Sequence, residues 1–79
     1  MPRTRKAVDT STYTGRFAVR LRSLREKRGM SVEELAEASG VPDKTLYRWE
    51  SADSAPDIEK FPQLAEALGI KPRTLLPEG

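Results

Sequence analysis

The chain has 79 residues, a formal net charge of +2, no cysteine and no histidine. That length predicts one small domain, whose single core is marginal but workable. Without cysteine or histidine there is no disulfide framework, no thiolate or imidazole ligand for a metal, and no imidazole for acid–base catalysis. No apolar run approaches a membrane span and no secretory signal follows the start, so we expect a cytoplasmic protein with no cofactor and no membrane association.

Charge is divided unevenly along the chain. Residues 1–30 hold nine Lys/Arg and two Asp/Glu, whereas residues 31–79 hold five Lys/Arg and ten Asp/Glu. This asymmetry predicts a basic N-terminal arm that meets a polyanion, although a soluble terminus with charges of no particular use fits equally well. Residues 1–13 show no helical period and are predicted to be the arm, disordered in isolation, with the folded domain over residues 14–77.

The first helix is predicted over residues 15–28. Apolar side chains recur there on one helical face, at Phe17, Leu21 and Leu24. Thr14 is the expected N-cap, with Thr12 as the rival, because either hydroxyl can accept a hydrogen bond from an unpaired backbone N–H. Gly29 ends the helix, since glycine readily adopts the left-handed conformation found there.

Two short helices joined by a tight turn are predicted next, over residues 32–39 and 43–51. Ser31 and Glu34 have the spacing of a capping box, in which each side chain satisfies the other residue's backbone N–H. Gly40 stops the first of the two helices. The sequence therefore places a helix, a turn and a second helix in the centre of the chain.

The second of these two helices has an apolar face and a polar face. Leu46 and Trp49 lie three residues apart and are expected to face the core. The opposite face carries the polar residues Asp43, Lys44, Tyr47, Arg48 and Ser51. A polar face of this kind is available to contact a partner.

The C-terminal part predicts two more helices, over residues 58–68 and 72–76. A helical period runs through Ile58, Phe61, Leu64, Ala65 and Leu68. Pro62 lacks a backbone donor, so we expect either a loose first turn at residues 58–61 or a helix that begins near Phe61. With no convincing strand, the fold class is all-α, a compact bundle of five helices.

Much of the chain resembles a known family. The segments that carry the resemblance are RLRSLREKRGMSVEELAEASGV, TLYRWE and PQLAEALGI, followed by LL. They resemble the Cro/repressor-type (XRE-like) helix-turn-helix family, which includes the lambdoid phage repressors and has the lambda-repressor-like fold. The resemblance implies a DNA-binding transcriptional regulator that lays its recognition helix, residues 43–51 here, in the major groove of double-stranded DNA.

The resemblance also implies roles for individual residues. The candidates for base contact are Asp43, Lys44, Tyr47 and Arg48. The candidates for phosphate or minor-groove contact are Arg3, Arg5, Lys6, Arg16, Arg20 and Ser31. Arg25 and Glu50 match a pair that forms an internal salt bridge in similar proteins. The alternative for that pair is two solvated side chains.

Three departures from the family pattern weaken the expected phosphate contacts. Val32 stands where a polar residue is common, and Pro42 offers no side-chain cap to the recognition helix. The loop after that helix carries Asp53 and Asp57, whose carboxylates repel phosphates. These departures favour an alternative function, a protein-interaction module such as an antitoxin-like or adaptor subunit.

Two residues of the recognition helix each have a second interpretation that needs no DNA. Tyr47 is either a base or sugar contact or an ordinary exposed tyrosine, and Asp43 suits the positive end of its helix.

A homodimer is expected through the C-terminal region around Ile70, Leu75 and Leu76. We expect no enzymatic activity, because nothing in the sequence supplies an apolar pocket to separate the pKa values of the carboxylates. We expect no small-molecule ligand, because no effector-sensing domain fits in the remaining residues, and no metal, because the chain has neither cysteine nor histidine.

Overall fold

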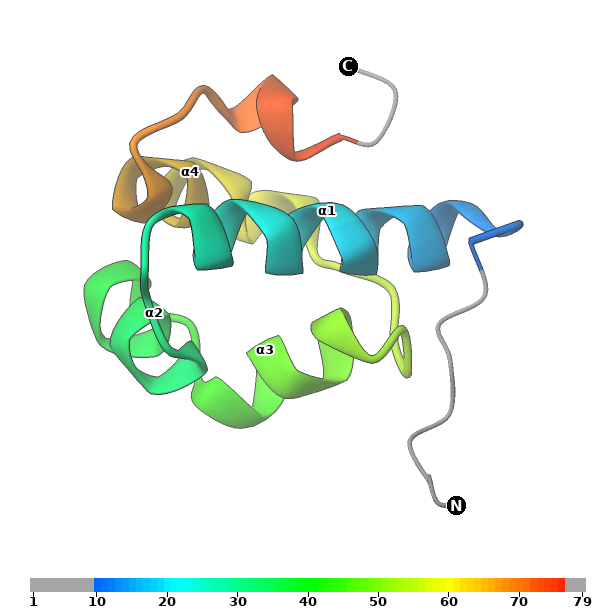
Figure 1. Cartoon of the computed structure of the whole chain (residues 1–79), viewed down its shortest axis with the longest axis horizontal. Coiled ribbons are helices and arrows are strands. Elements are labelled where there is room, and N and C mark those ends of the chain that lie inside the picture. Colours follow the sequence, from blue (N-terminus) through cyan, green and yellow to red (C-terminus); the bar gives the residue numbers. More distant parts are fainter. Residues whose placement is uncertain (1–9, 77–79) are drawn as a thin grey trace.

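The computed structural model describes residues 10–76 (Figure 1). They form four α-helices, α1 (Tyr13–Lys27), α2 (Val32–Ser39), α3 (Asp43–Glu50) and α4 (Phe61–Leu68), and two 3₁₀ helices, η1 (Ile58–Lys60) and η2 (Pro72–Leu75). The predicted all-α class is confirmed. The α-helices number four rather than five, because the last predicted helix forms only a short 3₁₀ segment. Within residues 10–76, no helix combines the length and apolar character needed to cross a membrane.

Helix α1 begins two residues earlier than predicted. The Thr12 hydroxyl accepts a hydrogen bond from the Gly15 N–H at 3.0 Å, so Thr12 is the N-cap. The expectation that Thr14 caps this helix is therefore wrong, and its rival is right. Thr14 instead lies within the first turn of the helix.

The α2–turn–α3 unit is built mainly from local signals. Ser31 Oγ accepts from the Glu34 N–H at 3.0 Å, and Glu34 Oε1 accepts from the Ser31 N–H at 2.8 Å, which confirms the capping box. Gly40 ends α2 with a φ of +79°, a left-handed conformation that glycine adopts readily. The Gln63 side chain on α4 donates to the Ser39 carbonyl at 3.0 Å and holds this turn against the rest of the fold.

Around Pro62, both predicted arrangements are present in part. Asp57 caps a 3₁₀ turn by accepting from the Glu59 N–H at 3.0 Å, and α4 begins directly after that turn at Phe61. Ile58, predicted on the inner face, is 69% exposed. A 3₁₀ turn has about three residues per turn, so the helical period of α4 cannot be extended back through it.

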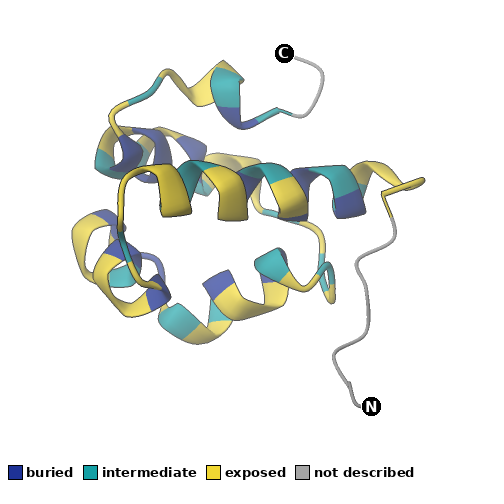
Figure 2. Cartoon of the chain, viewed as in Figure 1, coloured by how far each residue is buried: buried dark blue, intermediate teal, exposed yellow. Residues whose placement is uncertain are grey.

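The core lies among the four α-helices and η2 (Figures 1 and 2). Helix α1 packs on α3, α2 packs on both α3 and α4, and η2 covers α4 and α1. Phe17 stacks on Phe61 with ring centroids 5.4 Å apart, and its ring meets that of Trp49 edge-on at 6.3 Å. Buried residues turn inward from all four α-helices, and Trp49 is in the core as predicted.

Candidate nucleic-acid interface

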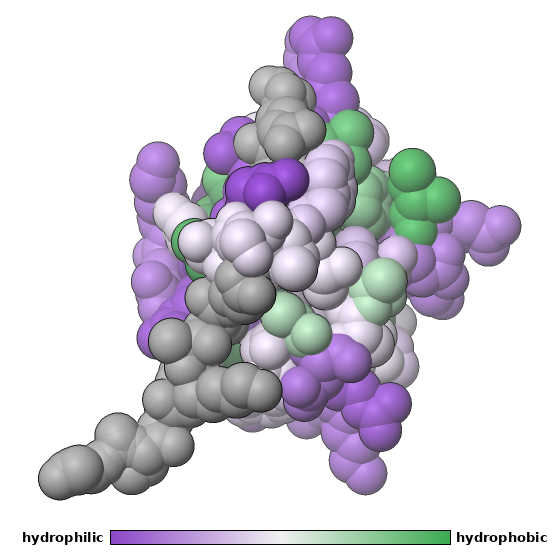
Figure 3. Space-filling view, turned by 90° about the vertical axis from the view of Figure 1, so that its right-hand side faces the viewer, coloured by the Kyte–Doolittle hydropathy of each residue, from purple (hydrophilic) through white to green (hydrophobic). Residues whose placement is uncertain are grey.

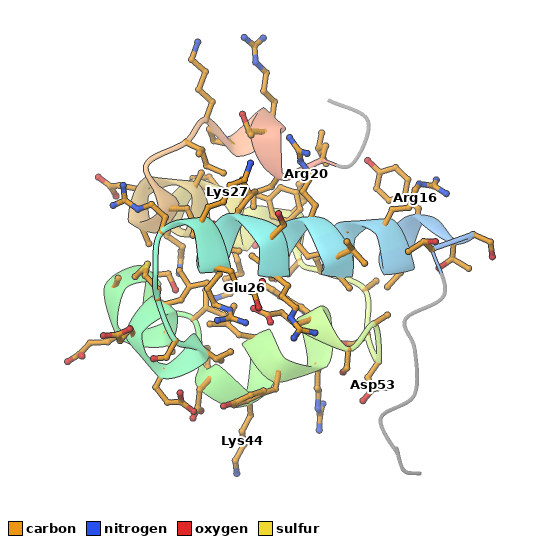
Figure 4. The ribbon with its side chains drawn as sticks, in the orientation of Figure 1. Arg16, Arg20, Glu26, Lys27, Lys44 and Asp53 are labelled. Atoms are coloured by element: carbon orange, nitrogen blue, oxygen red, sulfur yellow. The ribbon has the colours of Figure 1, made fainter. Side chains whose placement is uncertain are left out.

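The outer face of α3 is polar and largely exposed. Lys44, Tyr47 and Arg48 are exposed, whereas Leu46 and Trp49 are buried against the core. Figure 4 shows Lys44 projecting away from the body of the protein, on the opposite side of α3 from α1. The two faces of this helix are therefore divided as the sequence predicts.

Two of the four predicted base-contacting side chains keep their donors available. Within residues 10–76, the Lys44 ammonium and the Arg48 guanidinium make neither a hydrogen bond nor an ion pair. Both groups are donors only, and a guanidinium fits the paired acceptors of guanine or a phosphate. The structure thus leaves two cationic donors on one exposed helical surface.

The Asp43 side chain makes a hydrogen bond within its own helix. Its Oδ1 accepts a hydrogen bond from the Lys44 N–H at 2.8 Å, and the residue is half-buried. Pro42, the residue in the N-cap position, makes no side-chain cap, as expected. A carboxylate in the first turn is also stabilised by the helix dipole, so Asp43 has a structural role that needs no DNA.

Tyr47 is tied to the neighbouring helix. Its hydroxyl donates to Glu33 Oε2 on α2 at 2.6 Å, although the Tyr47 side chain is half exposed. This hydrogen bond raises the pKa of Tyr47 and lowers the pKa of Glu33. Sequence reasoning misses the role of Glu33, because no local pattern signals a contact across 14 positions.

Arg25 and Glu50 form the expected ion pair. Arg25 Nε and Nη2 donate to the two carboxylate oxygens of Glu50 at 2.7 and 3.0 Å, with side chains 13% and 9% exposed. Arg25 Nη1 also donates to the Met30 carbonyl at 2.8 Å. The hydrogen bonds to Glu50 raise the pKa of Arg25, although burial opposes the shift. The pair fixes the end of α3 relative to α1 and to the start of α2.

The predicted phosphate contacts are not gathered on one face. Arg20 Nε donates to the Thr74 carbonyl of η2, and Figure 4 shows Arg16 and Arg20 on the side of α1 away from α3. Arg16 donates to the Thr10 and Ser11 carbonyls at 3.3 and 3.4 Å. Ser31 remains at the start of α2, the helix that precedes α3. Arg3, Arg5 and Lys6, predicted to be in the arm, lie outside the described residues.

An acidic hollow lies in the angle between α2 and α3. It is shallow, has a volume of about 430 Å³, and is lined by Glu33, Ala36, Glu37, Gly40, Val41, Pro42 and Asp43. In the described part of the chain, no group of three or more Asp or Glu could hold a metal ion. Asp53 adds another carboxylate beyond the end of α3 (Figure 4). Acidic residues therefore lie on both sides of the two cations of α3.

The three residues predicted to form the dimer contact differ in how far their side chains are buried. Leu75 is fully buried in the core of its own chain, so it cannot contact a partner. Ile70 and Leu76 are only partly buried and pack against the edge of that core. On the end of the molecule shown in Figure 3, hydrophobic surface occurs in small areas among hydrophilic side chains.

A helix, a tight turn and a second helix with an exposed polar face define a helix-turn-helix fold. A helix-turn-helix family model matches residues 21–75. The chain therefore belongs to this family, in its XRE type.

Three similar proteins are consistent with this membership. A Pyrococcus abyssi protein named as an HTH-type transcriptional regulatory protein is 42% identical over 60 residues, which are 72% of this chain and 19% of that protein. The chain thus spans about a fifth of that relative's length. The restriction-modification controller protein C.AhdI from Aeromonas hydrophila is 36% identical, with 77% of this chain and 92% of that chain covered and a TM-score of 0.73. A hypothetical transcription factor, NHTF from Neisseria, is 25% identical, with 96% and 85% covered and a TM-score of 0.77.

Proposed function

We propose that this chain binds double-stranded DNA sequence-specifically as a transcriptional regulator, with α3 in the major groove. The observation that carries this proposal is the pair of exposed cations, Lys44 and Arg48, which lack partners within residues 10–76 on the outer face of α3. A surface arginine and lysine one helical turn apart are neighbours and can reach adjacent base edges together. We infer no catalytic activity and no cofactor for this site.

The four side chains of α3 have different proposed roles. Arg48 takes the O6 and N7 acceptors of a guanine, and Lys44 reaches a guanine or a phosphate. Asp43 supports the start of α3 and turns to a cytosine amine only if it gives up its bond to the Lys44 N–H. Tyr47 contacts the bases through its ring, because its hydroxyl already donates a hydrogen bond to Glu33.

Phosphate contact is proposed at the start of α2 and in the N-terminal arm. The Ser31 hydroxyl accepts from the Glu34 N–H, so its own proton can be donated to a phosphate oxygen at this positive end of the helix. We propose that Arg3, Arg5 and Lys6 follow the backbone or the minor groove. Because the acidic hollow and Asp53 repel phosphates, binding is expected to be weak per subunit and strongly dependent on salt.

We propose a homodimer that binds a two-fold symmetric site. Half-sites one helical turn apart, about 34–36 Å, would place the two recognition helices in successive major grooves. Ile70 and Leu76 are the proposed contacts, since both are partly exposed in the single chain. Sedimentation of Leu76→Asp beside the wild type tests this assignment, which fails if the variant remains dimeric.

A second candidate function is a protein-interaction module without specific DNA binding. The acidic hollow between α2 and α3 favours it, because carboxylates beside a recognition helix oppose a polyanion. A basic protein segment would suit such a surface. The regulator is preferred, since the same region leaves two cations without partners in the described chain.

Selection from a random duplex library at two salt concentrations distinguishes these functions. A regulator should enrich a two-fold symmetric motif at both concentrations. Retention without a motif that disappears at the higher salt would show that charge alone holds the DNA. That result would refute sequence-specific binding and favour the interaction module.

A further inference from the structure

We infer that Glu33 on α2 is a positioning residue for Tyr47, and that it sets which base edge the Tyr47 ring meets in the major groove. The inference rests on the proposed function, because it assigns a role within the same DNA-binding face. Neither residue type in isolation indicates such a role. The hydrogen bond between the two side chains does.

The bond joins the two helices of the helix-turn-helix on their exposed side. The Tyr47 hydroxyl lies 2.6 Å from Glu33 Oε2, and the two residues are 14 positions apart in the chain. This length is typical of a charge-assisted O–H···O⁻ bond, which is shorter than a bond between neutral groups. It restrains a long aromatic side chain that otherwise projects from α3 with half of its surface exposed.

The three acidic residues of α2 differ in what they contact. Glu34 accepts from the Ser31 N–H in the capping box, and Glu33 accepts from Tyr47. Glu37 lines the same hollow as Glu33, but its carboxylate makes no hydrogen bond within the described chain. Of these three, Glu33 therefore combines a charge beside α3 with a hydrogen bond to a side chain of α3.

The bond to Glu33 changes what Tyr47 can offer to a base. With its proton donated to Glu33, the phenol has no donor left for guanine O6 or N7. Its oxygen can still accept a hydrogen bond, and its carbon edge remains available for apolar contact. A carbon edge suits the 5-methyl group of thymine. Glu33 thus removes Tyr47 as a hydrogen-bond donor to a base and leaves it a ring contact beside the cationic donors Lys44 and Arg48.

The bond itself is tested in the free protein by titrating the phenol at 295 nm. Tyr13→Phe provides the background, because it leaves Tyr47 as the one tyrosine of the chain. Glu33→Ala should lower the pKa of Tyr47 towards its ordinary value, and Glu37→Ala should change it far less. Glu33 acts on this phenol by hydrogen bond and charge, with a smaller raising effect from Asp43 and a lowering one from Arg25. An unchanged pKa in Glu33→Ala would overturn the inference at its first step.

The role in readout is tested by repeating the library selection with variants. Glu33→Ala and Tyr47→Phe should each lose preference at the same base pair of the half-site, by roughly fivefold, the lower end of what one base pair contributes. The double variant should lose no more than either single one, because one bond is removed in all three. Glu33→Gln should keep most of the preference, since the amide oxygen still accepts.

Glu37→Ala is the matched control, because it removes the same charge from the same helix. If it alters the motif as Glu33→Ala does, charge rather than positioning sets the preference, and the inference is wrong. An unchanged motif in Glu33→Ala also overturns it. If the wild type selects no motif, the proposed function fails and the readout role fails with it, while the titration still decides whether the bond exists.

Discussion

Replacing Glu50 by alanine removes one partner of the ion pair between α3 and α1. The change leaves the Arg25 guanidinium without the two carboxylate oxygens that lie 2.7 and 3.0 Å away. Its bond to the Met30 carbonyl remains. The variant therefore keeps a largely buried cation that has lost the carboxylate bonded to it.

The expected loss is about 3 kcal/mol of unfolding free energy. Removing one partner of a buried pair costs about 3–5 kcal/mol, and the lower end applies because water reaches part of this site. The side chains of Arg25 and Glu50 are 13% and 9% exposed. A chain of 79 residues has a total stability of roughly 4–12 kcal/mol, so the variant would lose a large part of it.

Urea unfolding followed by the fluorescence of Trp49, the single tryptophan and a buried one, measures this loss. The matched control is Glu26→Ala, which breaks the exposed Arg22–Glu26 pair, with side chains 50% and 56% exposed. That pair should contribute less than about 0.5 kcal/mol. The reasoning is refuted if Glu50→Ala costs no more than Glu26→Ala.

Three further predictions concern the packing of the fold, its left-handed residues and its pH dependence. Gln63→Ala should cost about 1 kcal/mol by freeing the last carbonyl of α2, whereas Glu66→Ala on the exposed face of α4 should cost little in the same urea titration. Ala52→Gly should stabilise the fold by about 1 kcal/mol and raise the melting temperature, since Ala52 has a φ of +62°. Gly69→Ala, at a φ of +71°, should destabilise it by about 1 kcal/mol and lower the melting temperature. Folding lowers the pKa of Glu33 from its ordinary value of 4.5. The contribution of Glu33 to the free energy of unfolding is therefore present above pH 4.5 and is lost as the pH falls through the lower pKa of the folded state. The stability difference between wild type and Glu33→Ala should therefore shrink in acid.

Local signals in the sequence predict most of the fold. The capping box of Ser31 and Glu34 and the left-handed Gly40 act within a few residues, so the sequence pattern contains all that is needed to place α2. The choice between Thr12 and Thr14 is harder. Two threonines two positions apart are equally able to cap a helix, and the sequence pattern alone does not show that Thr12 is the one that does.

Non-local side-chain contacts account for what the sequence does not predict. The bond from Tyr47 to Glu33 and that from Arg20 to η2 join residues 14 and 54 positions apart. Helical periodicity gives the face on which a residue lies but not the rotamer that selects its partner. For that reason the resemblance implies a phosphate contact for Arg20, a cation on α1, but does not predict the hydrogen bond of its Nε to the Thr74 carbonyl of η2.

The central claim is that the outer face of α3 reads DNA sequence, and the affinity of Arg48→Ala for the selected duplex tests it most directly. Lys27→Ala is the control, because it removes the same charge from the end of α1, where Figure 4 shows its side chain on the side away from α3. Arg48→Ala should weaken specific binding by about 1–3 kcal/mol and relax the preference at one base pair, whereas Lys27→Ala should leave both unchanged. Equal affinities of Arg48→Ala and the wild type for that duplex would contradict the account.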